Sequence, residues 1–327
     1  MGKKEELVKK LRSSGRKDYI RLADSIENDL DYYHDMRTSD LPKGKTELAI
    51  KKGNANQHLD EIVDTSYDAY YSKHIQPNLK DEKGNGNIDY RDRQGFDPSK
   101  NFDDRKYRLS SVEIDGPKPI IGLGPTHFGQ FHRDRKIPLE KRLELMEKGL
   151  DEHGDPWIYF ARPCGVAVVH VSSEGNVWIG ERTRGDDEGP LNAVAGQIDY
   201  YGIEGFNPYK NGDNESFEEY GISLDIKNTP HQFVGISSNP TLGDCDFVFV
   251  VYSGKPDSYY ESGEWANNVK AQGRNPEHKQ PLYKISSKKE CIDLLEKGIV
   301  PGAKRPFAVM YSTRLGLEWL SENHFPD

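Results

Sequence analysis

The feature that most constrains the fold is an apolar hairpin near the middle of the chain. Residues 165–171 run Gly-Val-Ala-Val-Val-His-Val, and residues 177–182 run Val-Trp-Ile-Gly-Glu-Arg. Between them, residues 173–176 are Ser-Glu-Gly-Asn, a composition that favours a tight turn. The sequence therefore predicts a buried strand, a turn and a returning strand.

Further strands and helices alternate around this hairpin. Their apolar patterns and boundary residues predict strands at 107–114, 231–237, 247–252 and 282–285, and helices at 138–149, 287–297 and 306–321. Interleaving of this kind favours α/β layering over separate all-α and all-β halves.

The N-terminal part of the chain differs in character. Residues 3–36 carry apolar side chains at mixed helical spacings and predict a helix, and residues 57–77 predict a second one. The Gly-, Asn- and Asp-rich segment 81–104 indicates a long exposed loop. We therefore expect a helical extension with a long polar loop over 1–106 and one α/β domain over 107–327, whose core spans about 160–325.

Composition restricts the classes of partner. The formal charge is -9, from 54 acidic and 45 basic residues, whereas nonspecific nucleic-acid binding needs a basic face. No run approaches the roughly 18 apolar residues of a membrane span. The sparse cysteines Cys164, Cys245 and Cys291 have no metal-type spacing and suggest a reducing compartment. We expect a cytoplasmic protein that binds neither nucleic acid nor membrane; its oligomeric state stays open.

Three glutamates at helical spacing lie between the hairpin and the later strands. In a helix, Glu215, Glu218 and Glu219 stand at i, i+3 and i+4, so their carboxylates share one face. Like charges so placed repel, and a hard divalent cation such as Mg²⁺ removes that repulsion while leaving positions for water and phosphates. The alternative is a solvated acidic face, since charge runs usually face water. The preceding hairpin and glycine turn, together with Gly221 after the triplet, favour the metal site.

The segment around these glutamates resembles the Nudix box, Arg-Glu-apolar-x-Glu-Glu-x-Gly-apolar. Residues 214–222 are Asn-Glu-Ser-Phe-Glu-Glu-Tyr-Gly-Ile, and residues 194–196, Val-Ala-Gly, resemble the turn that opens the box. The resemblance implies a Nudix α/β/α sandwich with a mixed sheet, preceded by an N-terminal extension of helices and strand.

The same resemblance assigns roles to individual residues. It implies that Glu218 and Glu219 bind Mg²⁺ or Mn²⁺ and that Glu215 is a further ligand or the acid/base. Glu215 and Glu219 are accordingly the expected catalytic residues. The carbonyl of Gly196, or of neighbouring Gln197, is expected to complete the metal site.

The chain departs from the box at identifiable positions. The box arginine is replaced by Asn214, and a neutral amide does not orient Glu215 as a guanidinium fork does. Ser216 replaces an apolar residue, and the loop after Gly196 is longer than usual. The pair Asn211-Gly212 is expected to break the helix, which leaves only a short helical stretch before the glutamates.

Similarity outside the box points to the animal UDP-glucose pyrophosphatase branch of the family. The segments that resemble it, in the same order, are 107–111, 121–129, 163–168, 233–239 and 301–308. That branch also lacks the box arginine and has a longer loop. The resemblance implies Mg²⁺-dependent hydrolysis of UDP-glucose or UDP-galactose to UMP and a sugar 1-phosphate.

Three residues outside the box are expected to contact this nucleotide-sugar substrate: Arg182, Asn239 and Lys304. For Asn239, which follows a strand, the alternative is a residue that closes a turn. For Lys304 the alternative is a solvated side chain. Asp244 and Asp246, just before a strand, are expected mainly to polarise a turn, and the alternative is that they supply a metal ligand or a base.

Two other functions stay open. One is a Nudix-fold nucleotide-binding sensor with little or no turnover, motivated by Asn214. The other is an interaction module whose acidic helix is ordinary surface. Metal-dependent release of UMP separates the hydrolase from both, and nucleotide binding without turnover separates the sensor from the interaction module.

Overall fold

The computed structural model describes residues 2–30, 32–41, 49–53, 105–114, 118–183 and 189–326. The strands are β1 (Tyr33–Arg37), β2 (Ala49–Lys52), β3 (Arg105–Glu113), β4 (Ile120–His127), β5 (Cys164–Val171), β6 (Val177–Glu181), β7 (Leu191–Asn192), β8 (Val194–Gln197), β9 (His231–Ser238), β10 (Cys245–Tyr252) and β11 (Tyr283–Ile285). The helices are α1 (Lys3–Ser13), α2 (Lys17–Glu27), α4 (Phe128–Lys136), α5 (Leu139–His153), α6 (Pro208–Tyr220), α7 (Asp257–Glu261), α8 (Glu264–Ala271), α9 (Lys288–Lys297) and α10 (Tyr311–Asn323).

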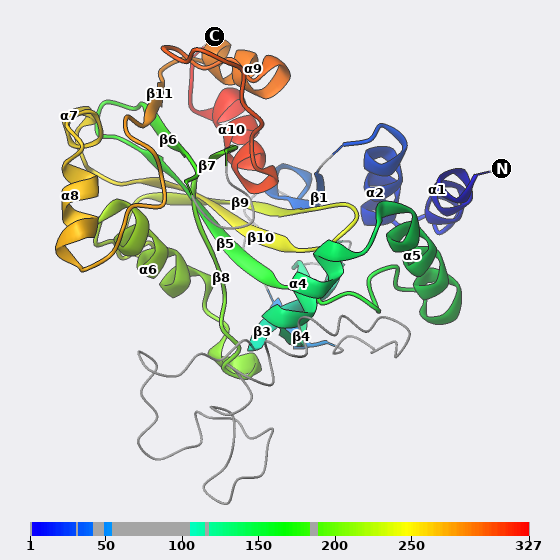
Figure 1. Cartoon of the computed structure of the whole chain (residues 1–327). Helices are drawn as coiled ribbons and strands as arrows, with labels where there is room; N and C mark the ends of the chain where they lie inside the picture. The colour runs from blue at the N-terminus through cyan, green and yellow to red at the C-terminus, as the bar shows by residue number, and fades with distance from the viewer. Residues whose placement is uncertain are drawn as a thin grey trace, which may run out of the picture.

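An eight-stranded mixed sheet forms the centre of the molecule (Figure 1). Its order is β1-β9-β10-β5-β6-β11, with β8 also pairing with β5 and β7 with β6. Strands β5 and β10 run parallel, and the remaining pairs are antiparallel. A second sheet has the order β2-β4-β3. The hairpin predicted from the apolar runs is present as β5 and β6.

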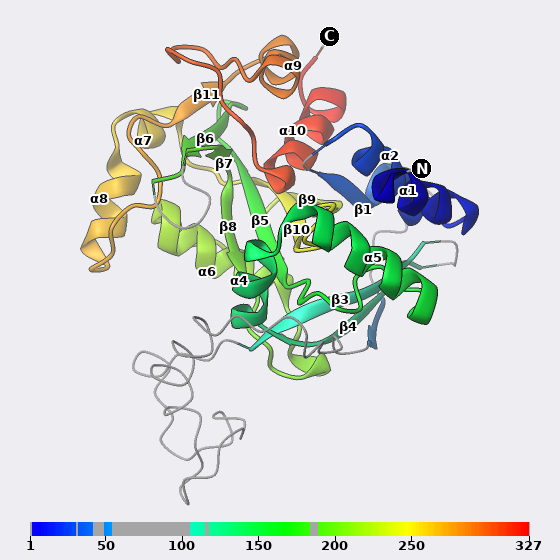
Figure 2. The ribbon, with the colours of Figure 1, turned by 45° about the vertical axis from the view of Figure 1, so that its right-hand side comes forward.

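Helices cover both faces of the main sheet, as Figures 1 and 2 show. One face of β5 carries Val166 and Val168 and packs with residues of α6 and α8, and the other carries Ala167 and Val169 and packs with residues of α9 and α10. The predicted α/β sandwich with a mixed sheet is confirmed. No helix in the described ranges has the length and apolar character needed to cross a bilayer.

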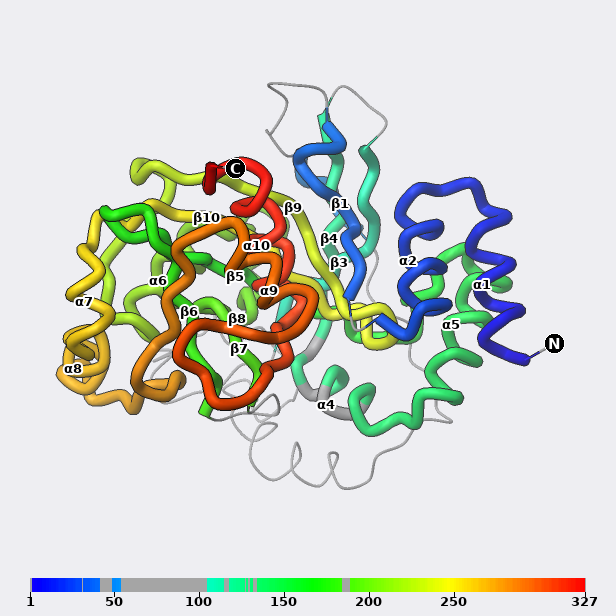
Figure 3. Tube along the Cα trace, turned by 90° about the horizontal axis from the view of Figure 1, so that it is seen from above, coloured from blue at the N-terminus to red at the C-terminus, as the bar shows by residue number. Residues whose placement is uncertain are grey.

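The N-terminal segment forms two helices and a strand, so the single helix predicted over 3–36 is wrong. Gly15, at φ 71°, separates α1 from α2, and Asp29, at φ 54°, lies in the turn before β1. Helices α1, α2 and α5 share a hydrophobic cluster to one side of the main sheet (Figure 3). The helix predicted at 57–77 and the loop predicted at 81–104 lie outside the described residues.

Strand β1 is anchored in the main sheet by buried polar groups. It pairs antiparallel with β9, and its Asp35 is 2 % exposed. The Asp35 carboxylate accepts hydrogen bonds from Arg162, at 2.5 Å, and from the hydroxyls of Tyr33, at 2.9 Å, and Ser238. These hydrogen bonds compensate for the burial of the Asp35 carboxylate, which would be costly without partners.

Two predicted helix boundaries are wrong, and for α5 the reason is close tertiary packing at a glycine. Helix α5 continues through Gly149, which packs tightly against Ile158, and ends at Gly154 in the left-handed conformation, at φ 67°. Helix α10 begins at Tyr311 rather than at residue 306.

Candidate active site

The three glutamates lie on α6, which runs unbroken through Asn211-Gly212. The predicted helix break is therefore wrong. The side chain of Asn207 caps the first turn by accepting a backbone hydrogen bond, and Pro208 occupies the first helical position. A Cβ on Gly212 would lie 2.7 Å from Ile226 Cδ1, so this glycine allows close packing and does not end the helix.

Glu215 lies directly against β8. A Cβ built on Gly196 would lie 2.1 Å from Glu215 Oε1, so the missing side chain makes room for the carboxylate. Burial raises the pKa of Glu215 well above its ordinary value, and the nearby carboxylates of Glu219, Glu218 and Glu277 raise it further. Several carboxyl groups are thus crowded beside β8, where the sequence predicts a metal site, and without a cation Glu215 favours its protonated form.

Glu219 is buried at the edge of β8, with 5 % of its surface exposed. One oxygen lies 2.8 Å from His278 Nε2, and the other accepts a hydrogen bond of 3.4 Å from the backbone N–H of Ala195. Glu218 is more exposed and accepts a 2.5 Å hydrogen bond from Arg274. Neither partner is evident from the sequence, because both follow the glutamates by more than fifty residues, at separations of 59 and 56.

Glu218 and Glu219 are thus both bound by side chains of the protein itself. Across the part of the chain that the structure describes, no three His, Cys, Asp or Glu side chains are grouped closely enough to hold a metal ion. Of the predicted ligands, Glu215, Glu219 and Gly196 meet at β8, while Glu218 points to Arg274.

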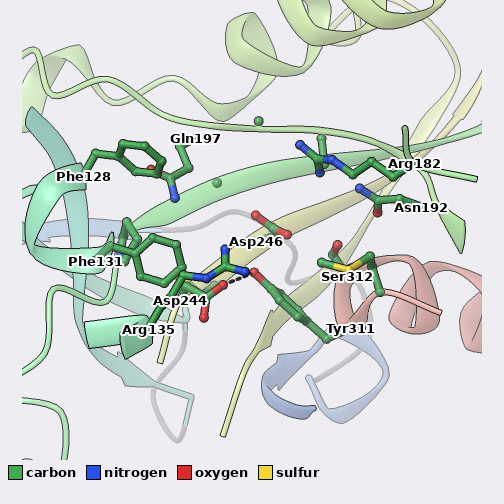
Figure 4. Close-up of a pocket in the computed structure, with 16 residues that line it drawn as sticks. Phe128, Phe131, Arg135, Arg182, Asn192, Gln197, Asp244, Asp246, Tyr311 and Ser312 are labelled. Carbon is green, nitrogen blue, oxygen red and sulfur yellow. Dashed lines mark hydrogen bonds between the residues drawn. The ribbon is translucent and has the colours of Figure 1, made fainter. Parts of the chain in front are cut away.

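A pocket of about 300 Å³ opens at the same edge, on the side of the sheet covered by α10 (Figure 4). Ala195 and Gly196 line it, and these two residues also contact Glu219 and Glu215. The pocket and the glutamates are therefore neighbours across β8. The first residues of α10, including Tyr311, form another part of its wall.

The floor of the pocket carries Asp244 and Asp246, for which the sequence predicts mainly a role in a turn. Asp244 accepts a 2.8 Å hydrogen bond from the Tyr311 hydroxyl. Asp246 lies over Gly165, where a Cβ would come within 2.1 Å of Oδ1. Burial raises the pKa of Asp246 to about 7, and the charge of Asp244 contributes to the same shift.

The three residues expected to bind the substrate do not lie together in the structure. Arg182 lines the pocket and lies 3.6 Å from Glu277. The side-chain oxygen of Asn239 accepts backbone hydrogen bonds from Thr241, at 2.9 Å, and Leu242, at 3.0 Å, so it closes a turn. Lys304 is exposed and does not line the pocket. The structure thus brings Arg182 alone of these three to the pocket.

Comparisons with known proteins give a limited result. No protein-family model matches the chain, and no curated protein matches its sequence. Three solved structures that resemble it in part are DR0079 from Deinococcus radiodurans (16% identity, 51% of this chain and 87% of that one, TM-score 0.32), an ADP compounds hydrolase (18% identity, 49% and 73%, TM-score 0.29) and a Nudix hydrolase from Nitrosomonas europaea (15% identity, 50% and 91%, TM-score 0.28). Identities and TM-scores at this level do not assign a function.

Proposed function

We propose that this chain is a Nudix-type hydrolase that uses Mg²⁺ or Mn²⁺ to cleave a UDP-sugar, of the UDP-glucose or UDP-galactose type, into UMP and a sugar 1-phosphate. The observation that carries the proposal is the convergence of Glu215 and Glu219 on β8. Gly196 leaves room for the first carboxylate, and the backbone N–H of Ala195 binds the second. A box-like glycine turn and the acidic face of the following helix therefore meet, with a pocket beside them.

The residues at this edge have the donor chemistry that a hard divalent cation requires, although their side chains would have to rearrange to surround it. Glu215, Glu218 and Glu219 supply carboxylate oxygens, which Mg²⁺ prefers, and the carbonyl of Gly196 is the further donor that the box resemblance implies. A cation would also relieve the repulsion between carboxylates crowded beside β8. Binding would require Glu218 to turn from Arg274.

The chain's own groups have distinct tasks in this reaction. A bound Mg²⁺ would offset the charge of the diphosphate and polarise the attacking water. Glu215, held against Gly196, orients that water or accepts its proton. Arg182 presents a guanidinium group suited to phosphate oxygens. Asn214 is exposed and uncharged, so we expect a modest rate that the Asn214→Arg substitution raises.

A panel of nucleotide sugars, dinucleotides and triphosphates with Mg²⁺ or Mn²⁺, read by product mass, tests the proposal. We expect UMP and hexose 1-phosphate from UDP-hexoses, with turnover depressed in Glu219→Gln and retained in Glu264→Gln, an exposed position on the neighbouring helix α8. Survival of UDP-hexoses while ADP-ribose or a triphosphate is cleaved would overturn the substrate assignment.

A nucleotide sensor is the second candidate. Arg274 and His278 already engage Glu218 and Glu219, an arrangement that would oppose metal binding. Nucleotide binding without cleavage would favour the sensor, and neither binding nor cleavage would favour an interaction module.

A further inference from the structure

We infer that the pocket on the α10 side of β8 binds the nucleoside half of the substrate, with the base against Phe128 and Phe131 and the ribose hydroxyls on Asp244 and Asp246. The inference deepens the proposed function and rests on it for the position of the diphosphate. Because the volume of about 300 Å³ is at the small end for ligand sites, the pocket suits half of a nucleotide sugar.

The order of groups along the pocket matches the order of groups in a nucleotide. Figure 4 shows Phe128 and Phe131 at one end, Asp246 in the middle and Arg182 at the other end. Gly196, which also lines the pocket, touches Glu215. A base lying against the two rings would place the ribose over the aspartate and direct the phosphates toward Arg182 and the glutamates.

The far end of the pocket offers flat surfaces to a planar ring. Phe128, Phe131 and Arg135 stand at i, i+3 and i+7 on α4, so they lie along one face of this helix. The two phenyl rings are 6.1 Å apart and inclined by 40°, and the Arg135 guanidinium lies 5.6 Å from the Phe131 ring. Bases stack on both aromatic rings and guanidinium planes.

The middle of the pocket is lined by two carboxyl groups, which suit hydroxyl donors. Carboxyl oxygens accept hydrogen bonds, and ribose offers two neighbouring hydroxyl donors. The Tyr311 hydroxyl fixes Asp244, and Gly165 gives Asp246 the space it occupies. A nucleoside contains a flat base and a hydroxyl-bearing ribose, so it matches both the aromatic end and the carboxyl-lined middle of the pocket. A hexose matches only the middle.

Isothermal titration calorimetry of the full chain in EDTA tests the inference without turnover. The probes are UMP, AMP, 2′-deoxy-UMP, 3′-deoxy-UMP and glucose 1-phosphate. We expect UMP to bind and glucose 1-phosphate to bind at least about 10-fold more weakly. Phe128→Leu and Asp244→Asn should each weaken UMP by about 10-fold, a size typical of one lost polar or stacking contact. Glu264→Gln, outside the pocket, should leave the affinity unchanged.

The deoxy probes separate a direct contact from a general loss of structure. In the wild-type chain, removal of one ribose hydroxyl should weaken binding, and in Asp244→Asn the same removal should matter less, because the partner is already altered. Tyr311→Phe, which frees Asp244 from its hydrogen bond, should reduce affinity with little change in melting temperature. Unchanged UMP affinity in both Phe128→Leu and Asp244→Asn would overturn the inference.

Other outcomes distinguish this inference from the proposed function. Tighter binding of glucose 1-phosphate than of UMP, with the same sensitivity to the pocket variants, would show that the pocket holds the sugar half and would overturn the inference. AMP binding without UMP binding would support the nucleoside site and overturn the UDP assignment. UMP binding as expected, with no nucleotide sugar cleaved in the presence of metal, would support the site and refute the hydrolase.

Discussion

Replacement of Gly196 by alanine tests whether the absence of a side chain at this position makes room for the Glu215 carboxylate. The new Cβ would lie 2.1 Å from Oε1, whereas ordinary contact begins at 3.4 Å, so the carboxylate must move by the difference, about 1.3 Å. Misplacement of a reacting group by about 1 Å costs on the order of 100-fold in rate. We therefore expect kcat for diphosphate cleavage to fall about 100-fold, measured by product release at saturating substrate.

The fold should tolerate this substitution, because the obstacle is the end of a flexible side chain. An off-rotamer glutamate costs roughly 1 kcal/mol, and about 1 kcal/mol lowers the melting temperature by only a few degrees in a domain of this size. Gly212→Ala, on the glutamate helix itself, is the matched control, since its Cβ would meet Ile226 at 2.7 Å and no glutamate. It should lose stability and keep its kcat. An unchanged kcat in Gly196→Ala would refute the placement of Glu215 as a catalytic contact.

Three further outcomes follow from the charges described above. Mg²⁺ or Mn²⁺ should raise the melting temperature by mass action, and the Glu218→Gln, Glu219→Gln double variant should lose this response; an equal rise in the variant would contradict the metal site. The Asp246 pKa is raised from 3.8 to about 7, so its protonated form favours folding, and that contribution is complete below pH 4 and lost as the pH rises through 7. Asp246→Asn should therefore gain stability over the wild type between pH 4 and pH 8, by at most about 4 kcal/mol in urea unfolding; a pH-independent difference would contradict this pKa shift. Asp35→Asn leaves Arg162 buried without its counter-ion and should cost about 3–5 kcal/mol in the same assay, and a loss below about 1 kcal/mol would show that the pair is replaced by other contacts.

Elements of the fold could be predicted where the pattern that specifies them lies in consecutive residues, and not where it depends on residues distant in the sequence. The hairpin of β5 and β6 follows from consecutive apolar residues. The apolar spacing of residues 3–36 predicts a helix that includes β1. The partner that stabilises Asp35 in this strand, Arg162, is 127 positions away and leaves no local signal. Glycine is common at helix ends, but Gly149 and Gly212 lie inside helices, where they are buried and a larger side chain would not fit. Close packing of this kind is a tertiary property that no local pattern reports.

The candidate site divides in the same way. Helical spacing alone places Glu215, Glu218 and Glu219 on one face, and the structure keeps them there. The partners His278 and Arg274 come from a segment beyond two further strands, so only the folded chain reveals them. The pocket position of Asp246 depends on the parallel pairing of β10 with β5, which brings it opposite Gly165.

Strand β1 also has a consequence for the order in which the molecule assembles during synthesis. Asp35 and its partner Ser238 are 203 residues apart in the chain. At the ribosome's roughly 5–20 residues per second, β1 waits about 10 to 40 seconds before β9 exists to pair with it. Helices α1, α2 and α5 come from the first half of the chain and can pack together during that interval. The nascent protein therefore carries an unpaired β1 segment that includes Asp35, a residue that the folded protein buries. The central sheet can be completed only after most of the chain has been made.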